Sequence, residues 1–254
     1  MKRFEDRRIL VTGAGSGIGQ ATVARLLKEG GTVIAADISA DGLEKTRAAA
    51  KEAGDDARLS VIVADVADEG SVLREIGKAV TLAGQLDVLV NAAGILRSTH
   101  THKTTLEEWN TVLKVNLTGT FLVTRQCLPA LLETGRGVVV NFSSTSASFA
   151  HPYMAAYAAS KGGIQSFTHT IAAEYAKQGL RAVAVAPGNI ESGMTKAPGI
   201  PDDADFSLFQ KMSPLIGHGF ASADSVSGII AALASDDGHF ITGTELRIDG
   251  GTHM

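Results

Sequence analysis

The segment RILVTGAGSGIGQATVARLL, residues 8–27, joins an apolar run to a glycine-rich turn and then to a stretch of helical periodicity. A short run rich in Val, Ile and Leu that ends at a turn is typical of a buried strand, and the later apolar repeat predicts a helix. Glycine is needed where φ is positive or where the backbone approaches another group closely. The start of the helix would present free N–H groups and the positive end of its dipole, which suits a pyrophosphate. The segment therefore predicts the first unit of an α/β fold with an anion-binding turn.

The same alternation continues along the chain. The apolar runs are nearly continuous and end in Gly, Asp, Asn or Ser, as parallel strands covered on both faces do. They span residues 8–13, 32–37, 59–65, 86–91, 137–144 and 181–188, and a more polar run spans 244–251. Helical segments lie between them, which predicts right-handed βαβ units. We expect one doubly wound α/β domain over residues 1–254, with a parallel sheet and helices on both faces.

Composition narrows the class of protein. The formal net charge is −4, which argues against a nucleic acid as the principal partner. The apolar runs are too short to span a membrane, and the mixed-charge start KRFEDRR does not resemble a secretory signal. Cys127 is the only cysteine, so we expect no intrachain disulfide and no thiolate metal site. A packing role for Cys127 and a cytoplasmic location fit this usage.

Residues just after the strands are the candidates for ligand contact, because ligands bind beyond the carboxyl ends of parallel strands. Asp37 ends the second run, where a carboxylate would accept hydrogen bonds from the ribose of a dinucleotide. A 2′-phosphate would place about two negative charges against it, at about 4 kcal/mol each for ~4 Å and a dielectric of ~20. Neither Ser16 nor Ile38 supplies a cation, so we expect NAD rather than NADP. The alternative for the glycine-rich turn is a tight turn that binds no ligand, and the alternative for Asp37 is a solvated carboxylate at a strand end.

Two weaker features lie at the next strand ends. Asp65 ends the third run and could meet an adenine edge. The small residues of NAAG, 91–94, would let backbone run close to a ribose. For Asn91, a structural tie between adjacent strand ends is as good an interpretation as ligand contact.

The segment AAYAASKGGIQSF, residues 155–167, places Tyr157 and Lys161 four positions apart, on one face of a predicted helix. An ordinary tyrosine has a pKa of about 10 and is a poor base at neutral pH. An ammonium about 4 Å away, at an effective dielectric of about 20, would lower that pKa by about three units. We therefore expect Lys161 to make Tyr157 a general acid or base. A solvated surface pair is the alternative.

The chain carries, in order, a set of seven short motifs that resembles the set found in the classical short-chain dehydrogenase/reductase family. The resemblance covers essentially the whole chain. Its motifs are TGAGSGIG (12–19), NAAG (91–94), Asn116 in VNLTG, NFSS (141–144), YAASK (157–161), PG (187–188) and IDGG (248–251).

The resemblance implies a Rossmann-type sheet of seven strands, a nicotinamide cofactor, and a catalytic set of Ser144, Tyr157, Lys161 and Asn116. Ser144 is preferred to Ser143 because thirteen residues separate it from Tyr157. The expected cofactor contacts are Gly13, Ser16, Gly17, Ile18, Gly19, Asp37, Asp65, Val66, Asn91, Ala92, Gly94, Tyr157, Lys161, Pro187, Gly188, Ile190 and Ser192. Ser192 occupies a position where the family often has a threonine, with Thr195 further on.

The family likeness also bears on the variable parts of the chain. Residues 191–220 would form a mobile substrate-covering segment. His100 and His102 lack an evident third ligand, so we expect no metal site. His151, Tyr153 and Met154 lie between the serine and tyrosine motifs and would line the substrate pocket or pack as a plain loop. Family members commonly form homotetramers, and we expect one here.

The sequence therefore predicts an NAD-dependent oxidoreductase that interconverts a small secondary alcohol and its ketone. One alternative is a 3-oxoacyl reductase acting on a thioester of acyl-carrier protein or coenzyme A, although such enzymes often use NADPH, which Asp37 disfavours. Another is a non-catalytic NAD-sensing protein, although such proteins usually lose the tyrosine or the lysine. The sequence does not identify the substrate, the direction of reaction or its stereochemistry.

Overall fold

The computed structural model describes residues 2–196, 198–217 and 219–254. Seven parallel strands form one sheet in the order β3-β2-β1-β4-β5-β6-β7. The predicted Rossmann-type doubly wound sheet is therefore confirmed. The strands are β1 (Arg8–Thr12), β2 (Thr32–Asp37), β3 (Leu59–Val63), β4 (Val88–Asn91), β5 (Val138–Phe142), β6 (Arg181–Pro187) and β7 (Thr244–Ile248).

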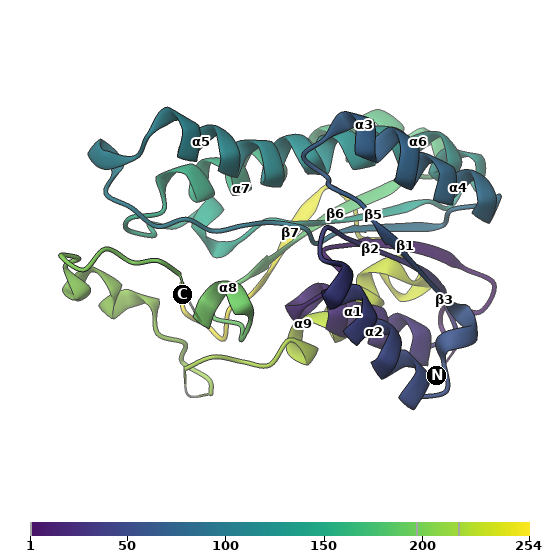
Figure 1. The fold of residues 1–254 in the computed structure, drawn as a ribbon, viewed down its shortest axis with the longest axis horizontal. Helices are drawn as coiled ribbons and strands as arrows, with labels where there is room; N and C mark the ends of the chain where they lie inside the picture. The colour runs from purple at the N-terminus through teal and green to yellow at the C-terminus, as the bar shows by residue number, and fades with distance from the viewer. Residues whose placement is uncertain (1, 197, 218) are drawn as a thin grey trace.

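Helices cover both faces of the sheet (Figure 1). They are α1 (Gly17–Lys28), α2 (Ala40–Glu52), α3 (Glu69–Ser71), α4 (Gly77–Ala83), α5 (Leu106–Leu113), α6 (Gly119–Glu133), α7 (Ala155–Tyr175), α8 (Gly193–Lys196) and α9 (Asp224–Ala234). Shorter turns are η1 (Asp56–Arg58), η2 (Val72–Ile76), η3 (Thr101–Lys103), η4 (Lys114–Thr118), η5 (Thr145–Ala147), η6 (Ala176–Gln178), η7 (Phe206–Met212) and η8 (Asp236–Gly238). Of these, η2 and η4 are π-helical.

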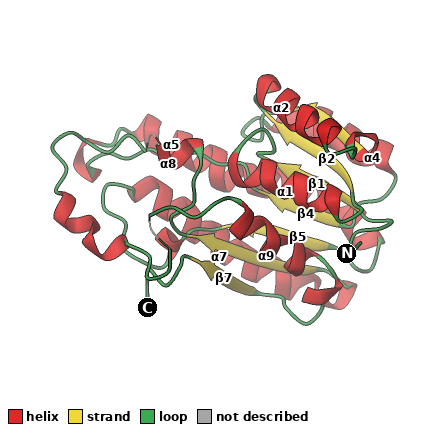
Figure 2. Ribbon diagram, turned by 90° about the horizontal axis from the view of Figure 1, so that it is seen from below, coloured by secondary structure: helices red, strands yellow, loops and turns green. Residues whose placement is uncertain are grey.

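The core is divided between the two faces by the two-residue period of the strands. Ile9 and Val11 of β1 pack with α1, α2 and α9, whereas Leu10 faces α4, α6 and α7. Figure 2 shows α1 and α9 in front of the sheet on the first of these faces. Cys127 is fully buried on the second face, as its apolar surroundings predict, and burial raises the pKa of its thiol to about 12. No helix of the described ranges is both long and apolar enough to cross a membrane.

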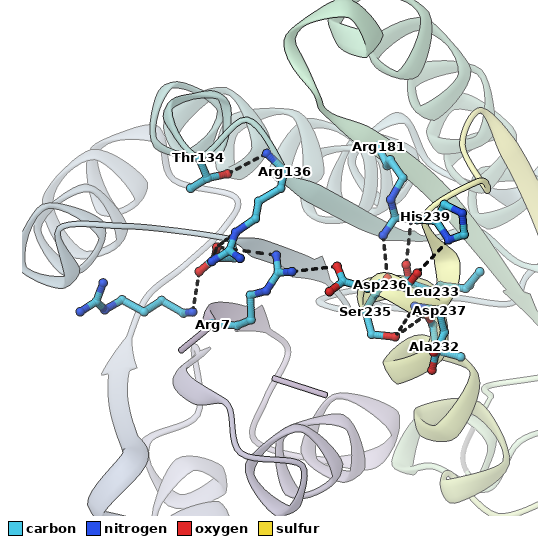
Figure 3. Close-up of polar contacts among 12 residues, drawn as sticks. Arg7, Thr134, Arg136, Arg181, Ala232, Leu233, Ser235, Asp236, Asp237 and His239 are labelled. Atoms are coloured by element: carbon cyan, nitrogen blue, oxygen red, sulfur yellow. Dashed lines mark hydrogen bonds and ion pairs between the residues drawn. The ribbon is translucent and has the colours of Figure 1, made fainter. Parts of the chain in front are cut away.

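The amino-terminal edge of the sheet is fixed by charged side chains. Asp87, which is fully buried, accepts a hydrogen bond from Arg8 N and lies 3.1 Å from Nη2 of Arg136. Arg7 bridges Asp87 to Asp236, at 3.8 and 2.8 Å (Figure 3). A buried carboxylate loses its hydration and needs hydrogen bonds and opposite charges in exchange. The contacts of Asp87 therefore stabilise the fold at this edge of the sheet. The candidate functional residues lie at the opposite edge, at the carboxyl ends of the strands.

Candidate active site

In the glycine turn that is predicted to bind an anion, the backbone segments lie so close together that a side chain would clash at Gly13 and Gly19. A Cβ added at Gly19 would lie 2.0 Å from the carbonyl oxygen of Gly13, and one at Gly13 would lie 2.7 Å from the backbone of Ala92. Gly13 also has a φ of +66°. Ser16, at the start of α1, is exposed and its side chain caps no N–H group of the described residues. The first turn of α1 therefore keeps N–H groups that suit a pyrophosphate.

Asp37 lies directly against this turn. Its Oδ2 accepts a hydrogen bond from Gly15 N at 2.9 Å, and its Oδ1 accepts one from Ser39 N at 2.8 Å. A Cβ at Gly15 would lie 2.9 Å from Cγ of Asp37, so only glycine lets the two approach. The structure thus places the expected ribose-binding carboxylate beside the expected phosphate-binding turn.

The end of β3 lies further along the same edge. Asp65 uses Oδ1 to accept a hydrogen bond from Ala67 N at 2.9 Å, which fixes the turn after the strand. Val66 is buried and packs on Gly119, where an added Cβ would lie 2.9 Å from Cγ2 of Val66. Ile18 is partly buried against the core beneath the glycine turn.

Asn91 uses its side chain inside the protein. Its Nδ2 donates to Thr124 Oγ1 at 2.9 Å and to Asn141 Oδ1 at 2.8 Å. Asn141 in turn donates to Thr168 Oγ1 at 2.9 Å. This buried chain of hydrogen bonds ties β4 to β5 and to helices α6 and α7. Of the two roles left open for Asn91, the contacts support the structural tie.

Asn116 occupies the π-helical turn η4, between α5 and α6, and is fully buried. Its Oδ1 accepts from Ile95 N at 2.8 Å, and its Nδ2 donates to Ile95 O at 2.9 Å and to Ser160 Oγ at 3.0 Å. A Cβ at Gly94 would lie 3.2 Å from this Oδ1 and 3.7 Å from Lys161 Nζ. Asn116 therefore positions the loop after β4 against the tyrosine helix. π-helical turns are often found at functional sites.

Ser144, Tyr157 and Lys161 come together where β5 ends and α7 begins. Lys161 is 4% exposed, and its Nζ donates to Phe142 O at 2.7 Å and lies 5.5 Å from the centre of the Tyr157 ring. Ser143 points away, because its hydroxyl donates to Lys161 O at 3.3 Å. Ser144 Oγ accepts from Ser146 N at 3.2 Å, at the start of η5. The two serines therefore face different ways, as strand alternation predicts.

The expected pKa of Tyr157 was wrong in direction. Burial raises the pKa of its phenol above the ordinary value, and the nearby Ser144 hydroxyl opposes this only in part. The sequence shows that Lys161 is close, but it does not show that both groups lose their water. Burial likewise lowers the pKa of Lys161 to about 8. Below that pH the ammonium is present to favour a phenolate as it forms.

The buried ammonium gives a prediction for stability. Lys161 has a pKa of about 8 when folded and 10.5 when unfolded. Between these values the unfolded chain binds more protons at Lys161, so this group should add about 2 kcal/mol to the free energy of unfolding between about pH 7 and about pH 9.5, whereas the raised pKa of Cys127 acts in the opposite direction in wild type and variant alike. Lys161→Met should lack this contribution, so the difference in the free energy of unfolding between wild type and variant should change by about 2 kcal/mol. Urea unfolding at both pH values measures it, and an equal change in wild type and variant would contradict the assigned burial.

The segment after β6 turns back toward the glycine turn. Gly188 N donates to Ile248 O at 3.0 Å, and a Cβ at Gly188 would lie 2.7 Å from Cβ of Asp249. Ile190 is buried, and Pro187 ends β6. Ser192 Oγ accepts from Thr195 N at 3.2 Å, while a Cβ at Gly17 would lie 3.4 Å from Cβ of Ser192. The structure thus brings Ser192, rather than a more distant residue, to the glycine turn.

The predicted covering segment, residues 191–220, contacts the loop after β4; its residues 197 and 218 lie outside the described ranges. In Figure 1 it extends away from the sheet on the side where α5 begins. Asp203 pairs with His100 at 2.8 Å and with Lys103 at 3.2 Å, which lowers the pKa of its carboxyl to about 2. Asp205 N donates to the hydroxyl of Tyr153 at 2.8 Å. His100 therefore uses Nε2 in a hydrogen bond with Asp203, and the described residues contain no group of three or more potential metal ligands.

Sequence reasoning missed the partners of this loop. Tyr153 has a φ of +66°, which is rare for a residue with a side chain, and its ring stacks on Phe209 at 5.9 Å. In the sequence, the only indication that Tyr153 lies near the site was its position between the serine and tyrosine motifs. No spacing pattern links Asp203 to His100, since about a hundred residues separate them.

The fold and the order of these motifs define an oxidoreductase built on a nucleotide-binding sheet, and comparison with known proteins gives its family. The model of a family described as enoyl-(acyl carrier protein) reductase matches residues 13–253. The chain belongs to the short-chain dehydrogenase/reductase family.

Particular relatives match along nearly the whole chain. A 3-oxoacyl-acyl-carrier-protein reductase of Thermotoga maritima is 38% identical over 98% of each chain. A 2-(R)-hydroxypropyl-CoM dehydrogenase of Xanthobacter autotrophicus is 38% identical over 96% of this chain and 98% of its own. The crystal structure of a levodione reductase superposes with a TM-score of 0.90, at 35% identity over 98% of each chain.

Proposed function

We propose that the protein is an NAD-dependent dehydrogenase/reductase that interconverts a small secondary alcohol and its ketone. The observation that carries the proposal is the meeting of Ser144, Tyr157 and Lys161 at the edge of the sheet that also holds the glycine turn and Asp37. A tyrosine and a lysine one helical turn apart would by themselves be weak support for this activity. The presence of all these residues at one edge of the sheet supports a common cofactor-binding and catalytic site.

The residues present fit a nicotinamide dinucleotide. The turn at Gly13–Gly19 admits no Cβ at its closest points, and the start of α1 keeps N–H donors for a pyrophosphate. Asp37 would accept hydrogen bonds from the adenosine ribose and would repel a 2′-phosphate, which supports NAD. When bound, the cofactor supplies the hydride acceptor or donor.

The chain's own residues would handle the proton and the substrate oxygen. Ser144 and Tyr157 hydrogen-bond the alcohol oxygen, and Tyr157 takes its proton during oxidation or returns it during reduction. The Lys161 ammonium stabilises the phenolate that forms, which matters because burial has raised the pKa of Tyr157. Asn116 acts through others: it fixes Ile95 and Ser160 around the tyrosine and lysine.

The proposal is tested by a panel of secondary alcohols with NAD, and of ketones with NADH, followed at the absorbance of the reduced nicotinamide. Turnover of a simple alcohol–ketone pair is the expected result. Turnover confined to 3-oxoacyl thioesters would favour a reductase acting on acyl-carrier protein or coenzyme A substrates. The matched family and the Thermotoga maritima relative are both named for reductases of acyl-carrier-protein substrates, which is the reason to include these thioesters in the test. Tight NADH binding without any turnover would favour a sensor.

We further propose that the chain works as one domain and assembles as a homotetramer through the outer surfaces of α5, α6 and α7. Leu106 is 73% exposed and Phe121 41% exposed on this surface, and Phe121 packs edge-to-face on Phe167 at 6.2 Å. Exposed apolar side chains gathered on neighbouring helices support a contact between copies. Light scattering should give about four times the 26.3 kDa chain mass. A monomeric mass would contradict the assembly without touching the proposed reaction.

A further inference from the structure

The last described residues of the chain fold back over the loop that follows Ser144. The His253 ring stacks on the Phe149 ring, with centroids 4.3 Å apart and planes within 2° of each other. It also lies 5.5 Å from the ring of His151. His151 Nε2 in turn lies 3.2 Å from Oγ1 of Thr145, the residue next to Ser144. A short series of contacts therefore links His253 to the expected catalytic serine.

The tail is held in this place by specific contacts. Asp249 accepts hydrogen bonds from Gly251 N at 3.0 Å and from His253 N at 3.3 Å. Arg247 donates to His253 O at 2.6 Å, and its guanidinium lies 5.1 Å from the centre of the Phe149 ring. Phe149 is thus contacted by both Arg247 and His253. These contacts fix the position of the His253 ring.

Within the described part of the chain, buried polar atoms without partners occur on segments that follow strands β4, β5 and β7, and Asn91 Oδ1 and Glu245 Oε2 within β4 and β7 are unpaired as well. Nε2 of His253, Oγ of Ser146 and Oγ of Ser98 are buried and have no hydrogen-bond partner among the described residues. Ser146 lies in η5, directly after the Ser144–Thr145 pair, and Ser98 is next to Thr99, whose N–H donates to Tyr153 O at 2.8 Å. Buried polar atoms are normally paired, because leaving one unpaired costs about 1–3 kcal/mol. Of these residues, Ser146 and His253 are linked to Ser144 by contacts, so their unpaired atoms support a ligand site beside it.

These groups are suited to an uncharged ligand. Hydroxyls donate and accept hydrogen bonds, as a substrate hydroxyl does, and an imidazole nitrogen can bond such a hydroxyl as donor or acceptor. Burial and the neighbouring His253 lower the pKa of His151 to about 4, so His151 is neutral at pH 7. The buried ammonium of Lys161 donates to Phe142 O. Arg247, the cation of this cluster, donates to His253 O and lies over the Phe149 ring, while Ser146, His151 and Thr145 carry no positive charge.

We propose that His253, together with Ser146, binds a second, uncharged oxygen of the substrate, so that the preferred substrates are vicinal diols and hydroxyketones. This inference rests on the proposed alcohol–ketone chemistry at Ser144 and Tyr157. It assigns His253 as a specificity-determining residue supplied by the segment that follows β7. The second oxygen would lie on the carbon next to the reacting carbinol.

The test compares butane-2,3-diol with butan-2-ol, which differ by one hydroxyl, with NAD as the oxidant. Wild type should favour the diol in kcat/KM by about tenfold or more, because a site with hydrogen-bonding groups for a hydroxyl discriminates against the analogue that lacks it. His253→Leu should remove most of this preference, because it should lower kcat/KM for the diol much more than kcat/KM for butan-2-ol. His253→Gln, which keeps a donor and an acceptor, should retain part of it.

His239→Leu is the matched control, because His239 is exposed and bonds to Asp236 at the opposite edge of the sheet (Figure 3). It should keep the full preference for the diol. Equal kcat/KM for the two alcohols in wild type would overturn the inference while the proposed function stands. An equal loss for both alcohols in His253→Leu would also overturn it, since it would show a structural role. No turnover of either alcohol, or of the corresponding ketones, would overturn the proposed function and the inference together.

Discussion

Tyr157→Phe should lower kcat for alcohol oxidation by about 10²–10⁴-fold, the range for loss of a positioned general base. The change removes one oxygen and leaves the ring that lies beside Lys161. The affinity for NADH should stay within about threefold, because the cofactor would be held mainly by the glycine turn and Asp37. Steady-state turnover together with NADH fluorescence titration measures both effects.

The matched control is Tyr175→Phe, the same chemical change at the far end of α7, about 27 Å away at 1.5 Å per residue. It should leave turnover unchanged. Wild-type oxidation should also increase from about pH 6 to about pH 8, because burial raises the pKa of the Tyr157 phenol, its deprotonated form is the base, and Lys161 keeps its charge below about pH 8. Reduction, which needs the protonated phenol, should decrease over the same range. A Tyr157→Phe variant with near wild-type turnover would exclude this residue as the proton carrier.

Much of the fold could be predicted because its signals are local. The continuous apolar strands and the glycine turn at residues 13–19 need only a few neighbouring residues to be interpreted. The structure agrees with both, and the close approach of Gly19 to Gly13 explains the glycines physically. The meeting of Ser144 with Tyr157 and Lys161 was expected from the family resemblance, whereas the sequence spacing alone placed only Tyr157 beside Lys161.

The remaining features depend on contacts between distant parts of the chain. The sequence places Lys161 one turn from Tyr157, but the pKa of Tyr157 depends on how much water the surrounding loops exclude. The pairing of Asp203 with His100 and the stacking of His253 on Phe149 join residues about a hundred positions apart. No periodicity encodes such pairs. The role of Asn91 stayed open for the same reason, because its partners Thr124 and Asn141 are on other elements.

Asp37→Asn should shift the ratio of kcat/KM for NAD to that for NADP toward NADP by roughly 100-fold or more. An aspartate carboxylate and the 2′-phosphate of NADP would repel each other by about 4 kcal/mol per charge pair at ~4 Å and a dielectric of ~20, before screening. Asp37 is only partly buried, so solvent reduces that energy, and a 100-fold change corresponds to about 2.7 kcal/mol. Asparagine keeps the shape of the side chain and an oxygen that can accept from Gly15 N or Ser39 N. The change in ratio therefore measures charge rather than collapse of the turn.

Asp41→Asn is the matched control, since Asp41 is exposed in the first turn of α2 and its loss changes the net charge by the same amount. It should leave the cofactor ratio unchanged. Because the charge effect is electrostatic, the difference between Asp37→Asn and wild type should become smaller as ionic strength rises. Asp37→Ala should shift the ratio in the same direction but also lower kcat/KM for NAD, because the turn loses an acceptor. Equal use of both cofactors by wild type would contradict the assignment of Asp37, while leaving the proton chemistry of Tyr157 to be decided by its own variant.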